Sequence, residues 1–120
     1  MEGKIILIID DEEKVRIALR YQLEGWGAEV IEAASIDEAL EEVSKHTPDL
    51  VLADFRLRKG ETGPKAIKAI RKKLKSDVPG ILFTGDTAPK RLQKAEKSGL
   101  KLLHKPVTAE ILHEAIAHEI

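Results

Sequence analysis

The sequence contains no cysteine, and this absence removes several kinds of chemistry at once. Without a thiol the chain forms no disulfide, builds no thiolate zinc site and has no cysteine nucleophile. The absence is compatible with any compartment, and a cytoplasmic location is the expectation.

Aromatic residues and long apolar runs are scarce as well. Aromatics make up 3% of the 120 residues, so the core must be aliphatic. No apolar run approaches the ~20 residues that cross a bilayer. The first apolar run is followed at once by acidic residues, which is not the pattern of a signal peptide. We therefore expect no membrane segment.

No sign of charge dominates either. The chain has 20 Lys and Arg against 21 Asp and Glu, a formal net charge of −1. The whole domain therefore gives no electrostatic indication of nucleic acid. One predicted helix is strongly basic, but its charges lie opposite Ile67, Ile70 and Leu74, which favours a solvated face.

Apolar runs and helical patterns alternate along the chain. The continuous β-branched run at 5–9 predicts a strand that is buried on both faces. Further strands are predicted at 28–33, 49–53, 81–83 and 100–103. Helices are predicted after Asp10, Ser35, Pro64, Pro89 and Thr108. A chain of this length fits one domain, over residues 1–120.

Five β-α units in succession predict an α/β fold, a doubly wound parallel sheet with helices on both faces. The strand at 28–33 is the most polar and should lie at an edge. A strand order of 2-1-3-4-5 places it there and leaves strands one, three and four inside.

Functional side chains follow four of the five predicted strands. Asp10 and Asp11 follow the first strand, Asp54 the third, Thr84 the fourth and Lys105 the fifth. Ligands of open parallel sheets bind at the carboxyl ends of the strands, near the switch in strand order. We therefore expect these five side chains to converge at one edge of the sheet.

The chemistry of this group points to a metal-assisted phosphoryl transfer. Three close carboxylates raise each other's pKa unless a cation relieves them. Oxygen ligands with open water positions describe a Mg²⁺ site. Asp54 is the expected nucleophile, because carboxylates form acyl-phosphates. Lys105 can pair with phosphoryl oxygens, and Thr84 can donate a hydrogen bond to one.

Four motifs in order carry a family resemblance: Asp10-Asp11, Asp54, Thr84-Gly85 and Lys105-Pro106. With each motif at a strand end, the chain resembles the receiver domains of response regulators over essentially its whole length. The resemblance implies a flavodoxin-like (βα)5 domain in phosphorelay signal transduction. It also implies a phosphoacceptor rather than an enzyme, which at most assists its own phosphorylation and dephosphorylation.

The resemblance assigns expected roles to particular residues. Asp54 should accept the phosphoryl group from a histidine kinase or histidine phosphotransfer protein. Asp11 should bind Mg²⁺ directly and Asp10 through water, with the backbone carbonyl of Arg56 as a further ligand. A cis peptide before Pro106 would aim Lys105 at the site.

Two further residues are expected to act on the lifetime of the phosphoryl group. Arg56 and Asp86 lie two places after Asp54 and Thr84, at positions that influence dephosphorylation in the resembling family. Their opposite charges could pair across the mouth of the site, and two independent solvated side chains are the alternative.

The chain also departs from the family pattern. Leu102 stands where many members have an aromatic switch residue, so movement is expected in the segment 84–89 and the next helix instead. The loop at 55–63 lacks the commoner proline and Asp-Gly pair. The segments 53–57 and 102–107 resemble receivers that are fused to hybrid sensor kinases.

Other interpretations fit the residues less well. A flavin carrier needs a phosphate loop where the acidic run 10–13 stands. An aspartate-nucleophile phosphatase needs an Asp-x-Asp arrangement and a cap domain. A pseudo-receiver that only binds partners would not need the complete acidic set. Asp10-Asp11 could also be a plain helix cap and Thr84-Gly85 a plain turn, but neither accounts for Asp54 with Lys105.

Overall fold

The computed structural model describes residues 1–85 and 99–120 of the chain. The predicted helix at 89–97 lies outside these residues. These described residues contain five strands, whose bounds fall within two residues of the predicted ones. The strands are β1 (Ile5–Ile9), β2 (Glu29–Ala33), β3 (Leu50–Asp54), β4 (Gly80–Thr84) and β5 (Lys101–His104).

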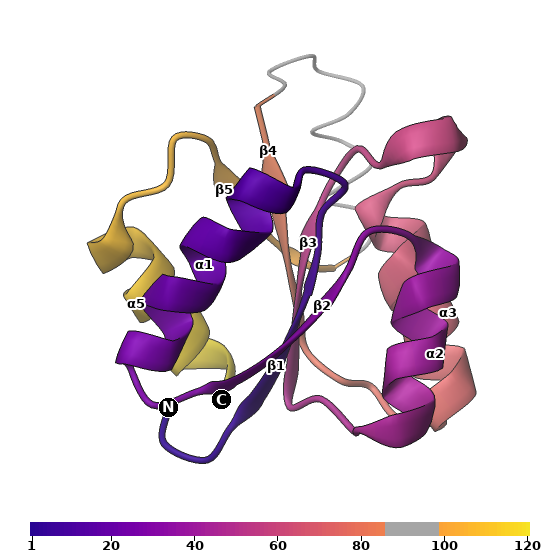
Figure 1. Ribbon diagram of the computed structural model, residues 1–120, viewed down its shortest axis with the longest axis horizontal. Helices are drawn as coiled ribbons and strands as arrows, with labels where there is room; N and C mark the ends of the chain where they lie inside the picture. The colour runs from indigo at the N-terminus through magenta and orange to yellow at the C-terminus, as the bar shows by residue number, and fades with distance from the viewer. Residues whose placement is uncertain (86–98) are drawn as a thin grey trace.

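The strands form one parallel sheet in the order β2-β1-β3-β4-β5, which confirms the predicted topology. The polar strand β2 lies at an edge, whereas β1, β3 and β4 are inside and almost wholly buried. Figure 1 shows the twist of this sheet between two layers of helices. The chain therefore has the α/β, flavodoxin-like fold.

The helices divide between the two faces of the sheet. Two helices, α1 (Glu13–Gly25) and α5 (Ala109–Glu119), cover one face, where Leu23 and Ile116 are fully buried. The other face is covered by α2 (Ile36–Lys45) and α3 (Gly63–Leu74). Both core layers are mainly aliphatic, as the scarcity of aromatic residues predicts.

Side-chain caps fix where three of the helices begin. The hydroxyl oxygens of Ser35, Thr62 and Thr108 each accept a hydrogen bond from the backbone N–H three residues later, at 3.2–3.3 Å. Such bonds satisfy donors that have no partner inside the helix. Pro64 stands in the first turn of α3, where its missing N–H costs nothing.

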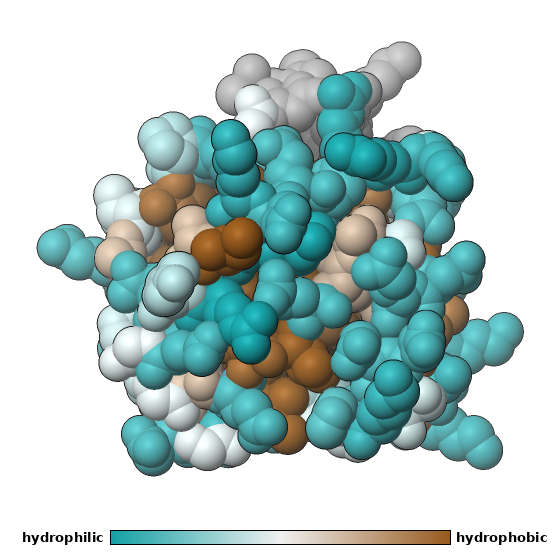
Figure 2. All heavy atoms as spheres, viewed as in Figure 1, coloured by the Kyte–Doolittle hydropathy of each residue, from teal (hydrophilic) through white to brown (hydrophobic). Residues whose placement is uncertain are grey.

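The two ends of the chain lie side by side, at the end of the sheet where β1 begins (Figure 1). Met1 and Ile120 both pack against the core layer beneath α1 and α5 and line one hollow. Figure 2 shows hydrophilic side chains over most of the viewed face, as a chain with 34% charged residues requires. Among the described residues, no helix combines the length and apolarity needed to cross a membrane.

Candidate functional site

Three carboxylates meet where β1 and β3 end. The strands are adjacent, and Ile9 is paired in register with Ala53, so the residues that follow are level with one another. Asp10, Asp11 and Asp54 each offer one carboxylate oxygen, and these oxygens lie within 4.8 Å of one another. The predicted convergence of the acidic side chains is therefore present.

Residues from β4 and β5 complete this edge of the sheet. The register pairs Thr84 with His104, and the N–H of Lys105 donates to the carbonyl of Thr84 at 2.8 Å. The ammonium of Lys105 lies 3.2 Å from Oδ2 of Asp54. The peptide before Pro106 is cis, as expected.

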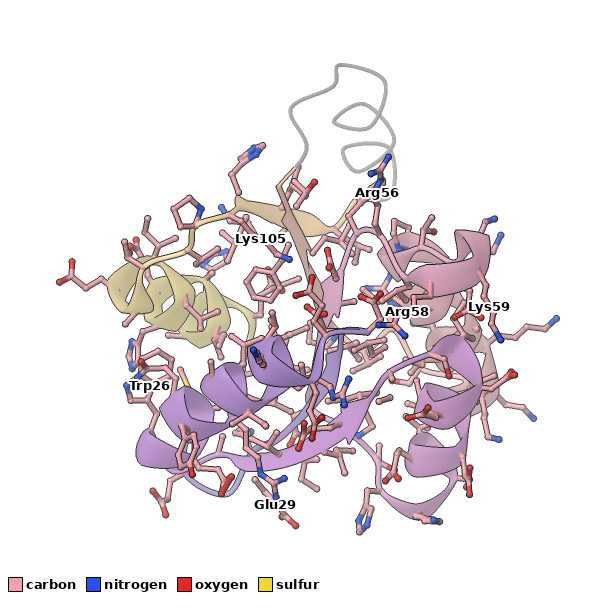
Figure 3. The ribbon with its side chains drawn as sticks, turned by 45° about the horizontal axis from the view of Figure 1, so that its top comes forward. Trp26, Glu29, Arg56, Arg58, Lys59 and Lys105 are labelled. Carbon is pink, nitrogen blue, oxygen red and sulfur yellow. The ribbon has the colours of Figure 1, made fainter. Side chains whose placement is uncertain are left out.

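These side chains line an open hollow of ≈ 530 Å³ on the surface. Its lining consists of Asp11, Glu12, Asp54, Arg56, Leu57, Thr84, Gly85 and Lys105. Figure 3 shows Lys105, Arg56 and Arg58 grouped at this end of the sheet, away from Trp26 near the far end of α1. A small anionic group can reach the Asp54 carboxylate from solvent through this opening.

Asp10 is the buried member of the acidic group, with 2% of its surface exposed. Burial raises the pKa of its carboxyl above 3.8, and the charges of Asp54 and Asp11 act in the same direction. The N–H of Glu12, which donates to Oδ1 of Asp10 at 2.9 Å, and the charge of Lys105 oppose the rise. A buried carboxylate beside two others is an environment that a divalent cation stabilises.

The sequence did not predict a role for Arg58, yet this residue contacts the site. Its Nε lies 3.1 Å from Oδ2 of Asp11, and 75% of the arginine side chain is exposed. It belongs to the short 3₁₀ turn η1 (Arg58–Gly60), in which Lys59 has a φ of 60°. The one available sequence clue was a cationic loop directly after Asp54.

The sequence also did not predict that Arg16 contacts the site. Its Nη1 donates to the backbone carbonyl of Asp10 at 2.6 Å, and its Nε pairs with Glu32 of β2 at 3.3 Å. An arginine in the second turn of a helix ordinarily indicates a solvated face. Nothing local to the sequence indicates that it turns back to the strand end.

Gly63, the first residue of α3, sets how closely this helix approaches the site. A Cβ atom at this position would lie 2.5 Å from the carbonyl oxygen of Asp54 and 2.8 Å from Cδ2 of Leu82. Only a residue without a side chain therefore fits there. The N–H of Gly63 donates to the carbonyl of Phe55, which closes the loop after Asp54.

Several expectations remain predictions. Arg56 lines the hollow and forms an isolated bridge with Thr62, and metal ligation by its carbonyl stays a prediction. Asp86 lies outside the described residues, so its pairing with Arg56 is untested. Leu102 packs, partly buried, against the core layer of α2 and α3.

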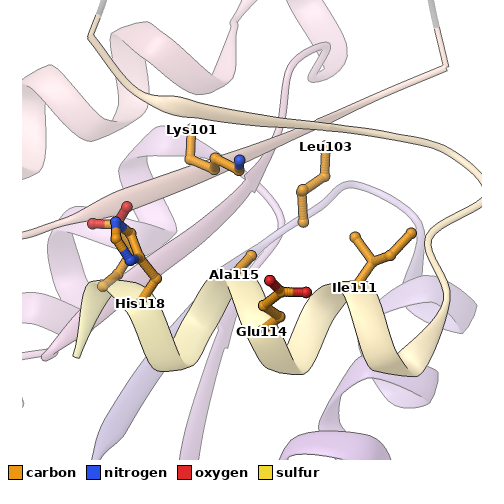
Figure 4. Close-up of a pocket in the computed structure, with 7 residues that line it drawn as sticks. Lys101, Leu103, Ile111, Glu114, Ala115 and His118 are labelled. Carbon is orange, nitrogen blue, oxygen red and sulfur yellow. The ribbon is translucent and has the colours of Figure 1, made fainter.

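No second group of this chemistry occurs in the described part of the chain. Apart from the three aspartates, no set of three or more His, Cys, Asp or Glu residues there brings ligand atoms together. His113 meets the ring of Trp26 edge-on, with the ring centroids 4.7 Å apart, near the far end of α1. Figure 4 shows a separate hollow between β5 and α5, lined by residues such as Leu103 and Ile111.

Comparison with known proteins agrees with this geometry. Residues 6–117 match the response regulator receiver domain family. The sensor kinase/phosphatase CqsS for the CAI-1 autoinducer, from Vibrio cholerae, is 31% identical over 93% of the chain. The transcriptional regulatory protein ZraR of Salmonella typhimurium is 35% identical over 98% of it. The chain spans 17% and 28% of the lengths of these two relatives.

Solved structures give the same result for the fold. The chemotaxis protein CheY4 of Vibrio cholerae superposes with a TM-score of 0.88 at 27% identity, covering 98% of this chain and 99% of that one. A response regulator receiver domain protein from Clostridium thermocellum gives a TM-score of 0.86 at 32% identity, covering 98% and 94%. Sequence and fold together place the chain in the family of response regulator receiver domains, the signalling domains of two-component systems.

Proposed function

We propose that the chain, acting as one receiver unit over residues 1–120, accepts a phosphoryl group on Asp54 in a reaction that requires Mg²⁺. The observation that carries this proposal is the meeting of three carboxylates within 4.8 Å, with the ammonium of Lys105 3.2 Å from Asp54. An acidic cluster alone is common on protein surfaces. Here the ammonium of Lys105 pairs with Asp54, and both residues line an open hollow. This arrangement fits an anionic substrate.

The donor set suits Mg²⁺ as the resident ion. Asp10, Asp11 and Asp54 offer only hard oxygen ligands, and the hollow leaves room for water in the remaining positions. The backbone carbonyl of Arg56 is the proposed further ligand. When bound, the ion neutralises charge on the phosphoryl oxygens as the group is transferred.

The chain's own residues provide the nucleophile and two of its supports. An oxygen of Asp54 attacks phosphorus and forms an acyl-phosphate. The P–N bond of the donor phosphohistidine breaks, and its electron pair stays with the imidazole, which takes up a proton. Lys105 pairs with one phosphoryl oxygen, and the Thr84 hydroxyl donates to another. No side-chain base is needed, because the carboxylate attacks in its ionised form.

The partner that supplies the phosphoryl group is proposed to be a histidine kinase or a histidine phosphotransfer protein. The similarity to a sensor kinase/phosphatase and to transcriptional regulators supports either a separate kinase or fusion to a kinase or output domain. The resemblance to hybrid-kinase receivers in segments 53–57 and 102–107 points to fusion with a kinase.

The proposed response to phosphorylation is a movement of Thr84 toward the new phosphoryl group, with change mainly in the segment 84–89 and in the surface near the predicted helix 89–97 and β5. Leu102 offers no ring that could rotate, so β5 itself should change little. Crystal structures with and without beryllofluoride would show this movement. A rearrangement centred on Leu102 while Thr84 stays in place would contradict it.

Phosphorylation itself can be tested with a small donor. Acetyl phosphate and Mg²⁺ should add the mass of one phosphoryl group to the intact protein, and EDTA should prevent it. Asp54→Asn should remain unlabelled, whereas Asp77→Asn, at an exposed aspartate before β4, should be labelled as well as the unmodified chain. Equal labelling of Asp54→Asn would assign the phosphoryl group to another residue and refute the proposal.

A further inference from the structure

A series of ion pairs extends from the exposed side of α1 to the acidic group. Arg20 pairs with Glu24 through Nε and with Glu32 through Nη1, both at 2.7 Å. Glu32 uses its other oxygen to pair with Nε of Arg16 at 3.3 Å. Arg16 then donates from Nη1 to the carbonyl of Asp10 at 2.6 Å. This last contact is the one that reaches the site.

The contact holds the backbone between two proposed metal-binding residues. The peptide group that carries the Asp10 carbonyl also carries the nitrogen of Asp11, and a peptide group is planar. Fixing the oxygen therefore fixes the direction in which Asp11 leaves the strand. On the other side of Asp10, its own N–H donates to the carbonyl of Ala33 at 3.1 Å. Strand β2 thus holds Asp10 on both sides, directly through Ala33 and through Arg16 by way of Glu32.

Arg16 and Arg20, the two arginines in this series of ion pairs, differ in how far they are exposed to solvent. The side chain of Arg16 is 16% exposed and that of Glu32 is 22% exposed, whereas 49% of the Arg20 side chain is exposed. Charge-assisted bonds that are shielded from water are stronger than exposed ones. The planar guanidinium also lets Arg16 hold Glu32 and the Asp10 carbonyl in a fixed relation, which an ammonium does not reproduce.

We propose that Arg16, oriented by Glu32, is a positioning residue that presets the Asp10-Asp11 peptide for the metal ion. Its hydrogen bonds go to Glu32 and to the carbonyl of Asp10, so it acts on the metal-binding residues through the backbone. Residues that hold a metal-binding residue in place commonly change metal affinity by about 10–100-fold when they are removed. The inference rests on the proposed function, since it assigns Arg16 a role in a Mg²⁺ site at Asp10 and Asp11.

The competing interpretation is that Arg16 only ties α1 to β2. Arg20 separates the two interpretations, because it also joins α1 to Glu32 but does not reach Asp10. If Arg16 only links α1 to β2, its loss lowers thermal stability without altering Mg²⁺ binding by the folded protein. Loss of a positioning contact weakens Mg²⁺ binding and loosens the backbone next to Asp10.

The experiment measures Mg²⁺ affinity by calorimetry and thermal unfolding for Arg16→Ala, Arg16→Lys, Glu32→Gln and Arg20→Ala. Arg16→Ala should bind Mg²⁺ about tenfold more weakly, the lower end of the range for residues that hold a metal-binding residue in place. Glu32→Gln should change affinity in the same direction, and Arg16→Lys should restore it only in part. Arg20→Ala should bind Mg²⁺ as the unmodified chain does, even if its unfolding temperature falls.

A metal-free measurement gives a second readout. The N–H of Glu12 donates to the Asp10 carboxylate, so its hydrogen exchange reports the order of this backbone. Exchange at Glu12 should be faster in Arg16→Ala than in Arg20→Ala, with EDTA present. Equal Mg²⁺ affinity and equal exchange in these two variants would overturn the positioning role alone. Failure of the unmodified chain to bind Mg²⁺ would instead overturn the proposed function, and the positioning role with it.

Discussion

At the scale of single residues, the burial of Asp10 has a consequence for stability. Burial raises the pKa of this carboxyl above 3.8 in the folded chain. The folded state therefore keeps a proton that the unfolded state loses as pH rises past 3.8. The stabilisation from this group is fully present below pH 3.8 and is lost as pH rises through the higher, folded-state pKa. At neutral pH without divalent ions, the ionised Asp10 carboxylate should therefore destabilise the fold.

Asp10→Asn should accordingly raise the unfolding temperature at pH 7 in EDTA. The amide oxygen can still accept from Glu12, so the change removes the charge and keeps the hydrogen bond. Below pH 3.8 the variant and the unmodified chain should unfold at nearly the same temperature. Thermal unfolding across this pH range is the measurement, with Asp77→Asn as an exposed control. A variant less stable than the unmodified chain at pH 7 would contradict the expected sign.

The ion pair between Arg58 and Asp11 gives a second prediction at this scale. While the guanidinium sits 3.1 Å from the Asp11 carboxylate, it competes with a metal ion for the same oxygen. The arginine is mostly exposed, so the pair is worth about 0–1 kcal/mol, which limits the effect to about fivefold. Arg58→Ala should therefore tighten Mg²⁺ binding by up to about fivefold in calorimetry at low salt.

Lys59→Ala is the matched control, since it removes one cation from the same turn without touching this pair. Equal tightening in both variants would assign the effect to net charge.

Arg58 and Arg16 both contact the site, and the sequence predicted neither contact. The carboxylates were predicted because strand ends fix where their backbone lies. The arginines reach the site because their side chains extend from one element to another, and no local sequence pattern indicates that direction.

At the scale of elements, the contact of α3 with β3 depends on Gly63. A Cβ atom there would overlap the carbonyl of Asp54 and the side chain of Leu82, so the helix would have to move. Gly63→Ala should lower the free energy of unfolding by about 1–3 kcal/mol, as overpacked cores do. Because the clash falls on Asp54, the variant should also bind Mg²⁺ more weakly.

Chemical denaturation and calorimetry on the same preparation would measure both effects. Gly25→Ala is the control, because a Cβ atom there meets nothing within 4 Å and the backbone is not in the left-handed region. Unchanged stability and Mg²⁺ binding in Gly63→Ala would show that α3 adjusts freely. The sequence predicted where α3 begins from its first-turn proline, and the structure adds Thr62 as the capping residue. It did not predict that the glycine between them sits against the strand end.

The elements in the described residues were otherwise well predicted, and the differences have simple causes. The first helix was predicted to begin directly after β1, at Asp10, whereas α1 begins at Glu13. The Asp10 carboxylate accepts from the N–H of Glu12 and holds the intervening turn outside the helix. Acidic residues favour a helix N-terminus, but the same residues satisfy backbone donors before it. Composition alone does not separate these two positions.

At the scale of the whole molecule, the order of the strands was predictable because one strand is visibly more polar than the rest. Glu29 and Glu32 mark β2 as an edge strand, and the apolar runs of β1, β3 and β4 require burial on both faces. Since carboxyl ends of parallel strands share one edge of the sheet, the site followed from the order. The segment 86–98, with Asp86, lies outside the described residues, and its part in the mechanism remains a prediction.

The metal should stabilise the whole fold, because the unfolded chain has no assembled site. At a Mg²⁺ concentration 100 times its dissociation constant, the free energy of unfolding should rise by about 2.7 kcal/mol. For a chain of this size that corresponds to roughly 10 °C in the unfolding temperature. Asp11→Ala should lose most of this increase, whereas Asp77→Asn should keep it. An equal increase in Asp11→Ala would exclude Asp11 as a ligand.

The adjacent chain ends have a practical consequence for construction of new proteins. Met1 and Ile120 lie beside each other, near the start of β1 and remote from the carboxylates at its other end. A short Gly-Ser bridge can therefore join them, and the ring can be reopened at another surface loop. By the same geometry, the domain can be spliced into an exposed loop of an unrelated host. In either arrangement the junction at Met1 and Ile120 lies away from Asp54.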